Sequence, residues 1–137
     1  IIHSPALGAE VFSDDVRMMQ LETILYPLVV AEEEKFISRM RAMGVKIVVL
    51  DIPLLFETGG QRRVDLTLLA TAPYFIQRQR VLARPNMNEA KFKHILARQI
   101  PDNQKREMAD VWVHTGLGKA LTMRQLKILL SSLMRQR

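Results

Sequence analysis

The stretch Asp51-Ile-Pro-Leu-Leu-Phe-Glu57 decides the fold that we predict for this chain of 137 residues. It follows the apolar run Ile47-Val-Val-Leu50. Consecutive apolar residues without alternation are typical of a strand buried on both faces, as in a parallel sheet covered by helices. Pro53 cannot continue the pairing of such a strand. Asp51 is therefore expected at the carboxyl end of a strand, where open α/β sheets bind their ligands.

Helical and strand patterns alternate along the rest of the chain. We expect one helix to begin with Ser13 as its N-cap and to end or restart at Pro27, and a second helix over 28–43. The other predicted elements are strands at 66–71 and 111–113 and helices at 73–84, 89–100, 101–108 and 119–135. Strands separated by helices predict the α/β class with a parallel sheet.

The composition indicates a globular protein, since hydrophobic residues make up 48% of the chain. No apolar run approaches the ~18 residues that a membrane span needs, so we expect no membrane contact. The chain has no cysteine, which excludes a disulfide scaffold and a thiolate metal site. This composition is compatible with a reducing compartment, and we expect a cytoplasmic location.

The net charge of +6 comes from one segment. Residues 78–106 hold eight Lys/Arg and two Asp/Glu, whereas the rest of the chain is balanced. Such a concentration favours a polyanionic partner, either nucleotide phosphates or a nucleic-acid backbone. The alternative is a solvated basic face whose arginines pair with nearby acids. Few aromatic residues lie in this segment, and no zinc-finger or RNP pattern occurs, so nucleic acid is the less favoured partner.

Arg80 and Arg84 are four residues apart on a predicted helix, so they share one face. Two planar guanidinium groups placed in this way can hold a phosphate chain with paired donors. One series of features resembles the region after the Walker-B-like strand of dephospho-CoA kinases. It consists of the predicted strand, Asp51, Pro53, Glu57 and the Gly59-Gly60 pair. The resemblance continues through Arg78-Gln-Arg80-Val-Leu-Ala-Arg84, Ile95-Leu-Ala-Arg98-Gln99, Lys105-Arg106, Ala109-Asp110 and Thr115-Gly116.

This resemblance covers roughly Val11 to the C-terminus and implies an activity and a fold. The activity is ATP-dependent phosphorylation of the ribose 3′-hydroxyl of dephospho-CoA, the last step of coenzyme A biosynthesis. The fold is a parallel three-layer (αβα) sheet of the P-loop kinase type. ATP, Mg²⁺ and dephospho-CoA are the expected small-molecule ligands. Three alternatives for the function stay open: another nucleoside or nucleotide kinase-like protein, a binding-only kinase remnant, and a nucleic-acid-binding module. A homo-oligomer stays open as well.

The family's phosphate-binding loop is missing, because no Gly-x-x-x-x-Gly-Lys-[Ser/Thr] sequence occurs in the chain. The family's Asp-Ala-Asp segment is missing too. We therefore expect residues 1–137 to be the C-terminal portion of a single kinase domain, with an incomplete sheet and no activity alone. Within it, the resemblance implies a helical substrate-side region at 11–44 and a basic lid region at 73–108.

The resemblance also implies four groups of site residues. The catalytic group is Arg80, Arg84 and Arg98, the substrate-binding group is Leu54, Phe56 and Glu57, the nucleotide-binding group is His114, Thr115 and Gly116, and the Mg²⁺ ligand is Asp51. Asp51 has an equal structural alternative as a turn cap, and Leu54 and Phe56 have one as core residues. Two positions depart from the family pattern: Tyr26 replaces the histidine of a His-Pro pair, and His114 stands where Asn or Asp is usual.

Overall fold

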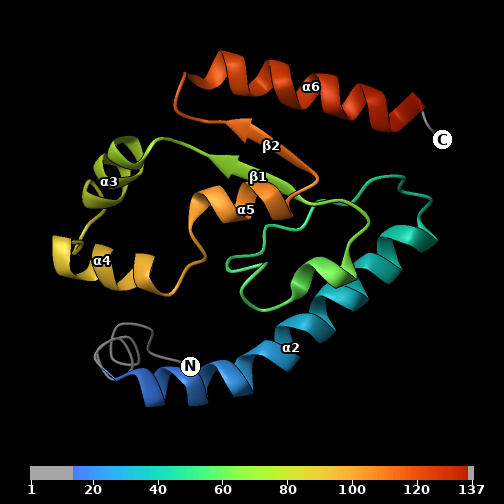
Figure 1. Ribbon diagram of the computed structural model, residues 1–137. Coiled ribbons are helices and arrows are strands. Elements are labelled where there is room, and N and C mark those ends of the chain that lie inside the picture. Colours follow the sequence, from blue (N-terminus) through green and yellow to red (C-terminus); the bar gives the residue numbers. More distant parts are fainter. Residues whose placement is uncertain (1–13, 136–137) are drawn as a thin grey trace. The chain divides into compact units, whose positions relative to one another are not determined.

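The structure is a computed structural model that describes residues 14–135 (Figure 1). The chain forms two compact units, Ile1–Asp51 and Ile52–Arg137. None of the helices in the described range is long and apolar enough to cross a membrane.

The first unit contains one long helix, α2, which runs from Asp15 to Ala42. Its N-cap is Asp14, whose carboxylate accepts hydrogen bonds from the backbone N–H groups of Val16 (2.9 Å) and Arg17 (3.2 Å). These bonds satisfy donors that have no partner within the first turn of a helix. Ser13, the N-cap predicted from the sequence, lies outside the described residues.

The predicted end of the helix at Pro27 is wrong, because Pro27 lies inside α2. A proline in a helix interior removes one backbone donor and crowds the preceding turn, at a cost of ~3 kcal/mol. Both flanking segments have a helical pattern, however, and extending an existing helix is easier than nucleating a new one. The two helices predicted on either side of Pro27 therefore form one.

The predicted strand at 47–50 is also wrong, since these residues are not assigned to any strand. Over residues 14–135 the sheet has two strands, β1 (Leu68–Thr71) and β2 (Val111–His114). An extended segment needs a neighbouring strand for its backbone donors and acceptors. An apolar run without such a neighbour does not become a strand, whatever its composition.

The second unit is built on the parallel pair of β1 and β2, which confirms the predicted α/β class. The connection between the strands contains α3 (Tyr74–Leu82), α4 (Glu89–Ala97) and α5 (Asp102–Met108). After β2 the chain continues into α6 (Lys119–Arg135). Helix α5 contacts β1 and α6 contacts β2, and the two helices lie on opposite sides of the strand pair (Figure 1). A short 3₁₀ helix, η1 (Gly60–Arg63), precedes β1.

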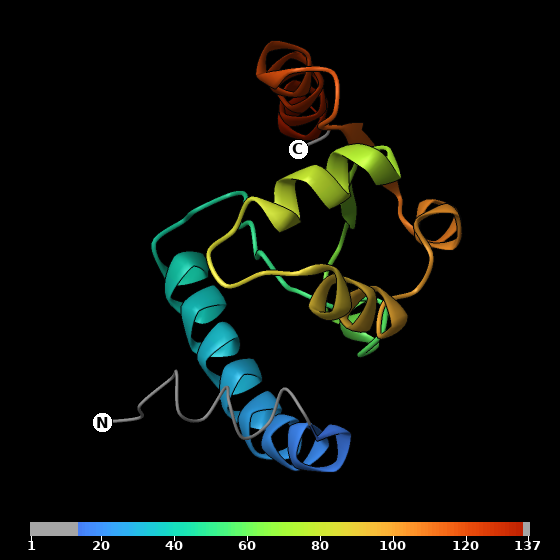
Figure 2. The same ribbon diagram turned by 90° about the vertical axis from the view of Figure 1, so that its left-hand side faces the viewer.

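Helices α3 and α4 follow each other in the chain and pack against each other at a steep angle (Figures 1 and 2). The ring of Tyr74, at the start of α3, lies 5.8 Å from the ring of Phe92. Arg78, one turn further on, forms an ion pair with Glu89 at the start of α4. Phe92 is 2% exposed and is the largest fully buried side chain in the described residues. An aromatic contact between exposed Tyr74 and buried Phe92 and a surface ion pair therefore join the two helices.

Thr67 and Asp110 join the beginnings of the two strands. The backbone N–H and the hydroxyl of Thr67 donate to Oδ2 of Asp110 at 2.7 and 2.6 Å, and the Asp110 N–H donates to the Thr67 hydroxyl at 2.9 Å. The Thr67 hydroxyl first, and its backbone N–H second, lower the pKa of Asp110 below its ordinary value, against an opposing effect of burial. These bonds stabilise the ionised carboxylate in the folded state.

We expect the variant Thr67→Val to raise the pKa of Asp110 toward its ordinary value, because valine removes the hydroxyl donor and keeps the shape. A carboxyl whose pKa is lower in the folded state stabilises the fold above its unfolded pKa, and this stabilisation disappears as pH falls through the folded pKa. The stability difference between wild type and variant should therefore shrink in acid. Carboxyl ¹³C NMR titration gives the pKa, and urea unfolding at several pH values gives the stability.

The control for this experiment is Thr67→Ser, which retains the hydroxyl and should retain the low pKa. Equal titration midpoints for Asp110 in wild type and Thr67→Val would contradict the assignment.

Candidate functional site

The carboxyl ends of β1 and β2 meet at one edge of the sheet, where Thr71 pairs with His114. The next residue after β2, Thr115, donates from its backbone N–H (2.8 Å) and its hydroxyl (3.1 Å) to the carbonyl oxygen of Thr71. These bonds keep the chain after β2 close to the chain after β1. The carboxyl edge of a parallel sheet is the usual ligand side of such folds.

Arg80 lies against this edge. Its Nη1 donates to the hydroxyl of Thr115 at 3.1 Å, and its Nη2 donates to the carbonyl oxygen of Thr115 at 2.6 Å. A guanidinium group holds its donors in a fixed plane, so two bonds to one residue fix its orientation. The structure thus brings together a residue predicted as catalytic and one predicted as nucleotide-binding.

A cavity of about 260 Å³ opens beside these two residues. We call it the arginine cavity; its charged and polar walls include Arg80, Arg84, Gln99, Asp102, Lys105 and Thr115. Three of these side chains are cationic and one is a carboxylate. The excess of positive charge suits a phosphorylated ligand.

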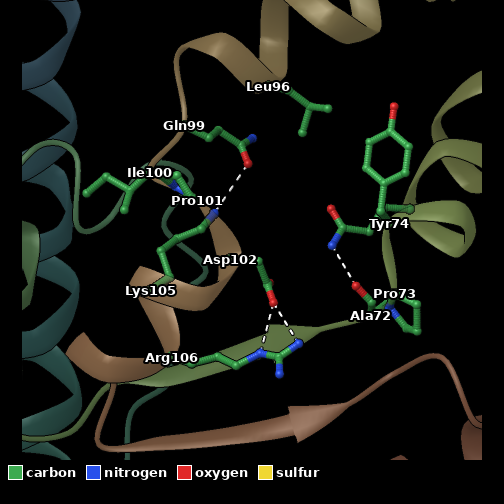
Figure 3. Close-up of a pocket in the computed structure, with 11 residues that line it drawn as sticks. Ala72, Pro73, Tyr74, Leu96, Gln99, Ile100, Pro101, Asp102, Lys105 and Arg106 are labelled. Atoms are coloured by element: carbon green, nitrogen blue, oxygen red, sulfur yellow. Dashed lines mark hydrogen bonds and ion pairs between the residues drawn. The ribbon is translucent and has the colours of Figure 1, made fainter.

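A neighbouring cavity of about 310 Å³ lies between α3, α4 and α5 (Figure 3). We call it the tyrosine cavity; its walls include Tyr74, Gln77, Leu96, Gln99, Lys105 and Arg106. Figure 3 shows Tyr74 and Leu96 on one side of the space and Lys105 and Arg106 on the other. Gln77 is held in the wall by a 2.6 Å bond from its Nε2 to the carbonyl oxygen of Ala72. Ala72, Gln77, Gln99, Asp102 and Lys105 line both cavities.

The carboxylate of Asp102 is neutralised within the protein. Its Oδ2 accepts from the hydroxyl of Thr71 at 2.8 Å and from Nε of Arg106 at 2.9 Å. The guanidinium of Arg106 also lies 5.7 Å from the ring centre of Trp112, within the range of a cation–π contact. Since Arg106 balances the charge of Asp102, the cations of the arginine cavity keep their excess charge.

Sequence reasoning did not assign roles to Thr71, Asp102 or Arg106. One available signal was the spacing of four residues between Asp102 and Arg106, which places both on one helix face. Thr71 had no comparable signal, because its bond to Asp102 joins residues 31 positions apart.

None of the three residues predicted to bind substrate lines either cavity. Leu54 has a positive φ of 55°, and its carbonyl oxygen accepts from the N–H of Thr58. Phe56 is buried at 8% exposure. Glu57 accepts a 2.8 Å bond from the N–H of Ile100 and lies 4.0 Å from Nζ of Lys105. Glu57 thus contacts the loop between α4 and α5.

The other predicted site residues are placed as follows. Arg98 is the C-cap of α4. The ring of His114 makes an edge contact with Trp112, with 5.0 Å between ring centres, and its backbone N–H donates to Oε1 of Gln125 at 3.1 Å. Neither Arg98 nor His114 lines the two cavities, whereas Arg84 lines the arginine cavity.

Asp51, the predicted Mg²⁺ ligand, is exposed and belongs to the first unit. Over residues 14–135, no three His, Cys, Asp or Glu side chains form a group that could hold a metal ion. Mg²⁺ usually keeps several waters and uses one or two carboxylates together with substrate phosphates. A single carboxylate fits this donor chemistry but does not by itself form a site, so Asp51 stays a predicted ligand.

Gly116 follows Thr115 at a point where the two chain segments after the strands touch. A Cβ atom at Gly116 would lie 2.9 Å from Cδ of Pro73. We expect Gly116→Ala to lower the free energy of unfolding by roughly 1–3 kcal/mol, because a rigid proline ring cannot easily move away. Urea unfolding measures this change.

The double variant Pro73→Ala, Gly116→Ala is the matched control for this prediction. Relative to Pro73→Ala alone, the added alanine at Gly116 should cost less, since the crowding atom is gone. Wild-type stability of Gly116→Ala would show that the close approach is unimportant.

The family model and the curated relatives that match this chain are all described as dephospho-CoA kinases. The family model for dephospho-CoA kinase matches residues 2–118. A curated dephospho-CoA kinase of Mesorhizobium japonicum is 46% identical over 137 residues, which is 100% of this chain and 70% of that protein. One of Bartonella quintana is 44% identical over 129 residues, covering 94% of this chain and 66% of that protein.

A third curated dephospho-CoA kinase, from Paramagnetospirillum magneticum, is 52% identical over 101 residues, covering 74% of this chain and 48% of that protein. A crystal structure from Thermus thermophilus superposes with a TM-score of 0.72 at 34% identity, over 96% of this chain and 67% of that one. The chain therefore spans about half to two thirds of the length of most of the proteins it matches.

Proposed function

The chain belongs to the dephospho-CoA kinase family, and on this premise we propose that it carries the nucleotide-facing part of an enzyme that phosphorylates the ribose 3′-hydroxyl of dephospho-CoA with ATP. The observation that carries the proposal is the contact of Arg80 with Thr115 in the wall of the arginine cavity. It joins a cation suited to phosphate with the loop that the resemblance implies for the nucleotide.

Phosphoryl transfer depends mainly on positioning and on stabilising charge along the transferred group. Arg80 lies in the last turn of α3, Arg84 lies two residues beyond the end of that helix at Leu82, and both line the arginine cavity. In the proposed function they hold the phosphates of ATP in line for attack by the hydroxyl group. Residues 73–108 form the proposed lid, whose closure excludes water from the reacting groups.

The remaining roles in this proposal follow the resemblance. Arg98 supports the lid, Leu54, Phe56 and Glu57 belong to the dephospho-CoA side, and residues 11–44 form the substrate-side region. Mg²⁺, when bound, would neutralise charge on the ATP phosphates, and Asp51 is its proposed ligand through water. A cytoplasmic location is part of the same proposal.

A small phosphorylated ligand fits the observations better than a nucleic-acid backbone. The cations Arg80, Arg84 and Lys105 line one cavity instead of following an extended surface. Arg78, on the same helix, forms an ion pair with Glu89 and is not in the cavity wall. Part of the basic segment is thus used in internal ion pairs, and three of its cations gather in one compact site.

We expect the 137-residue chain alone to show no kinase activity, because it has no Gly-x-x-x-x-Gly-Lys-[Ser/Thr] loop to cradle the β- and γ-phosphates. Loss of one such donor typically costs ~10²–10³ in kcat, and a whole loop supplies several. A coupled assay for ADP formation that depends on dephospho-CoA tests this. Turnover at ordinary rates by the chain alone would contradict it.

The proposed function is tested directly by a chimera. In the Mesorhizobium japonicum protein, the region that matches this chain over all 137 residues is replaced by the chain itself. We expect the chimera to phosphorylate dephospho-CoA, with the product identified as coenzyme A by mass spectrometry. A chimera with a cooperative thermal transition but no such activity would argue against the function.

In the same chimera, we expect Arg80→Ala and Arg84→Ala each to lower kcat by roughly 10²-fold, the scale of one lost charge-stabilising donor. Stability should change little, since exposed ion pairs contribute about 0–1 kcal/mol. Lysine at either position should restore little activity, because an ammonium group lacks the planar pair of donors. Steady-state kinetics and thermal unfolding measure the two effects.

The matched control is Arg124→Ala, which removes an exposed arginine from α6. It should leave kcat unchanged. Wild-type kcat in both Arg80→Ala and Arg84→Ala would place these residues among ordinary surface arginines.

A further inference from the structure

We propose that Lys105 is a further phosphate-binding residue of this site, located where the arginine cavity and the tyrosine cavity adjoin. The inference rests on the proposed function, because it takes the phosphates of a nucleotide as the ligand of the arginine cavity. It assigns to α5 a direct part in binding, in addition to Arg80 of α3 and Arg84 after the end of α3.

The position of Lys105 is unusual for a lysine. Its side chain is 17% exposed and lines both cavities. Figure 3 shows the side chain leaving α5 toward Gln99, whose Oε1 accepts from Nζ at 3.3 Å. Lysine side chains usually extend into solvent, and one held within a cavity wall has lost hydration that some other group must replace.

The protein supplies part of that replacement through Glu57. The carboxylate of Glu57 is 13% exposed and lies 4.0 Å from Nζ of Lys105. The N–H of Ile100 donates to the same carboxylate at 2.8 Å and fixes its position. This arrangement keeps a negative charge near the ammonium group.

The protein does not use all the donors of Lys105. An ammonium group has three N–H donors, and Gln99 accepts one of them. The 4.0 Å separation from Glu57 exceeds the length of an ordinary hydrogen bond. The other carboxylate in the cavity walls, Asp102, is bonded to Arg106 and Thr71. Donor capacity is therefore left at the point where the cavities adjoin.

The three cations of the arginine cavity come from separate parts of the chain. Arg80 comes from α3, Arg84 follows the end of α3, and Lys105 comes from α5. A phosphate chain in this cavity would be held by cations of two chain segments, which limits its orientation more than cations of one segment can. We infer that Lys105 contributes to affinity for the phosphates and not for the base or ribose.

Binding to the 137-residue chain tests this inference, with ATP, tripolyphosphate and adenosine as probes in calorimetry or NMR titration. Lys105→Gln should weaken binding of ATP and of tripolyphosphate about tenfold or more, as expected for loss of a charged hydrogen bond. Its affinity for adenosine should stay the same. The matched control Lys127→Gln removes an exposed lysine of α6 and should bind all three probes as wild type does.

Each other outcome overturns the inference in a distinguishable way. Wild-type ATP affinity in Lys105→Gln, with lost affinity in Arg80→Ala, would remove Lys105 from the site and leave the proposed function standing. Equal weakening of ATP and adenosine would assign Lys105 a structural role only. If the wild-type chain bound neither ATP nor tripolyphosphate, this role of Lys105 in the chain would be wrong, and the activity of the chimera would still test the proposed function separately.

A second measurement needs no variant, so it holds even where Lys105→Gln fails to fold. Acetic anhydride acetylates lysine amines, and mass spectrometry follows each site separately. ATP and tripolyphosphate should slow acetylation of Lys105, whereas adenosine should not, and Lys127 should react equally in all cases. Equal acetylation of Lys105 with and without ATP would overturn the inference.

Discussion

The parallel register of β1 and β2 is the constraint on which the contacts of the site depend. It sets Thr71 opposite His114, so that the chain segments leaving both strands emerge side by side. A slip of one residue would turn every side chain of a strand to the other face. The bonds between Thr67 and Asp110 at the opposite end oppose such a slip, because both partners are fixed by backbone and side-chain atoms together.

Local sequence patterns predicted several helices and strands closely. The helix predicted over 119–135 and the strand predicted over 111–113 match α6 and β2 to within one residue. The prediction failed at Pro27 and at residues 47–50, where the outcome depends on helix continuation and on a neighbouring strand. A single sequence does not show which segments will be neighbours, so such errors arise at these places.

The site could be predicted only in part for a similar reason. The clustering of positive charge predicted a binding site within residues 78–106. It could not show which of these cations form ion pairs with acids of the protein and which line a cavity. The two acids of this segment, Glu89 and Asp102, pair with Arg78 and Arg106. Neither of these arginines was among the predicted site residues, and the predicted pair Arg80 and Arg84 lines a cavity. A basic segment thus indicates a partner most clearly once its internal ion pairs have been assigned.

Glu57 belongs to the stretch 51–57, from which the fold was predicted, and it contacts residues near the two cavities. Its carboxylate fixes the loop before α5 through Ile100 and lies beside Lys105. An acid in this position does not need to touch a ligand to affect binding, since its charge acts on the ammonium group of Lys105 at 4.0 Å. The loop that contains Glu57 and the cation on α5 are therefore joined by electrostatics. We expect Glu57, which lines neither cavity, to act on the proposed site through Lys105.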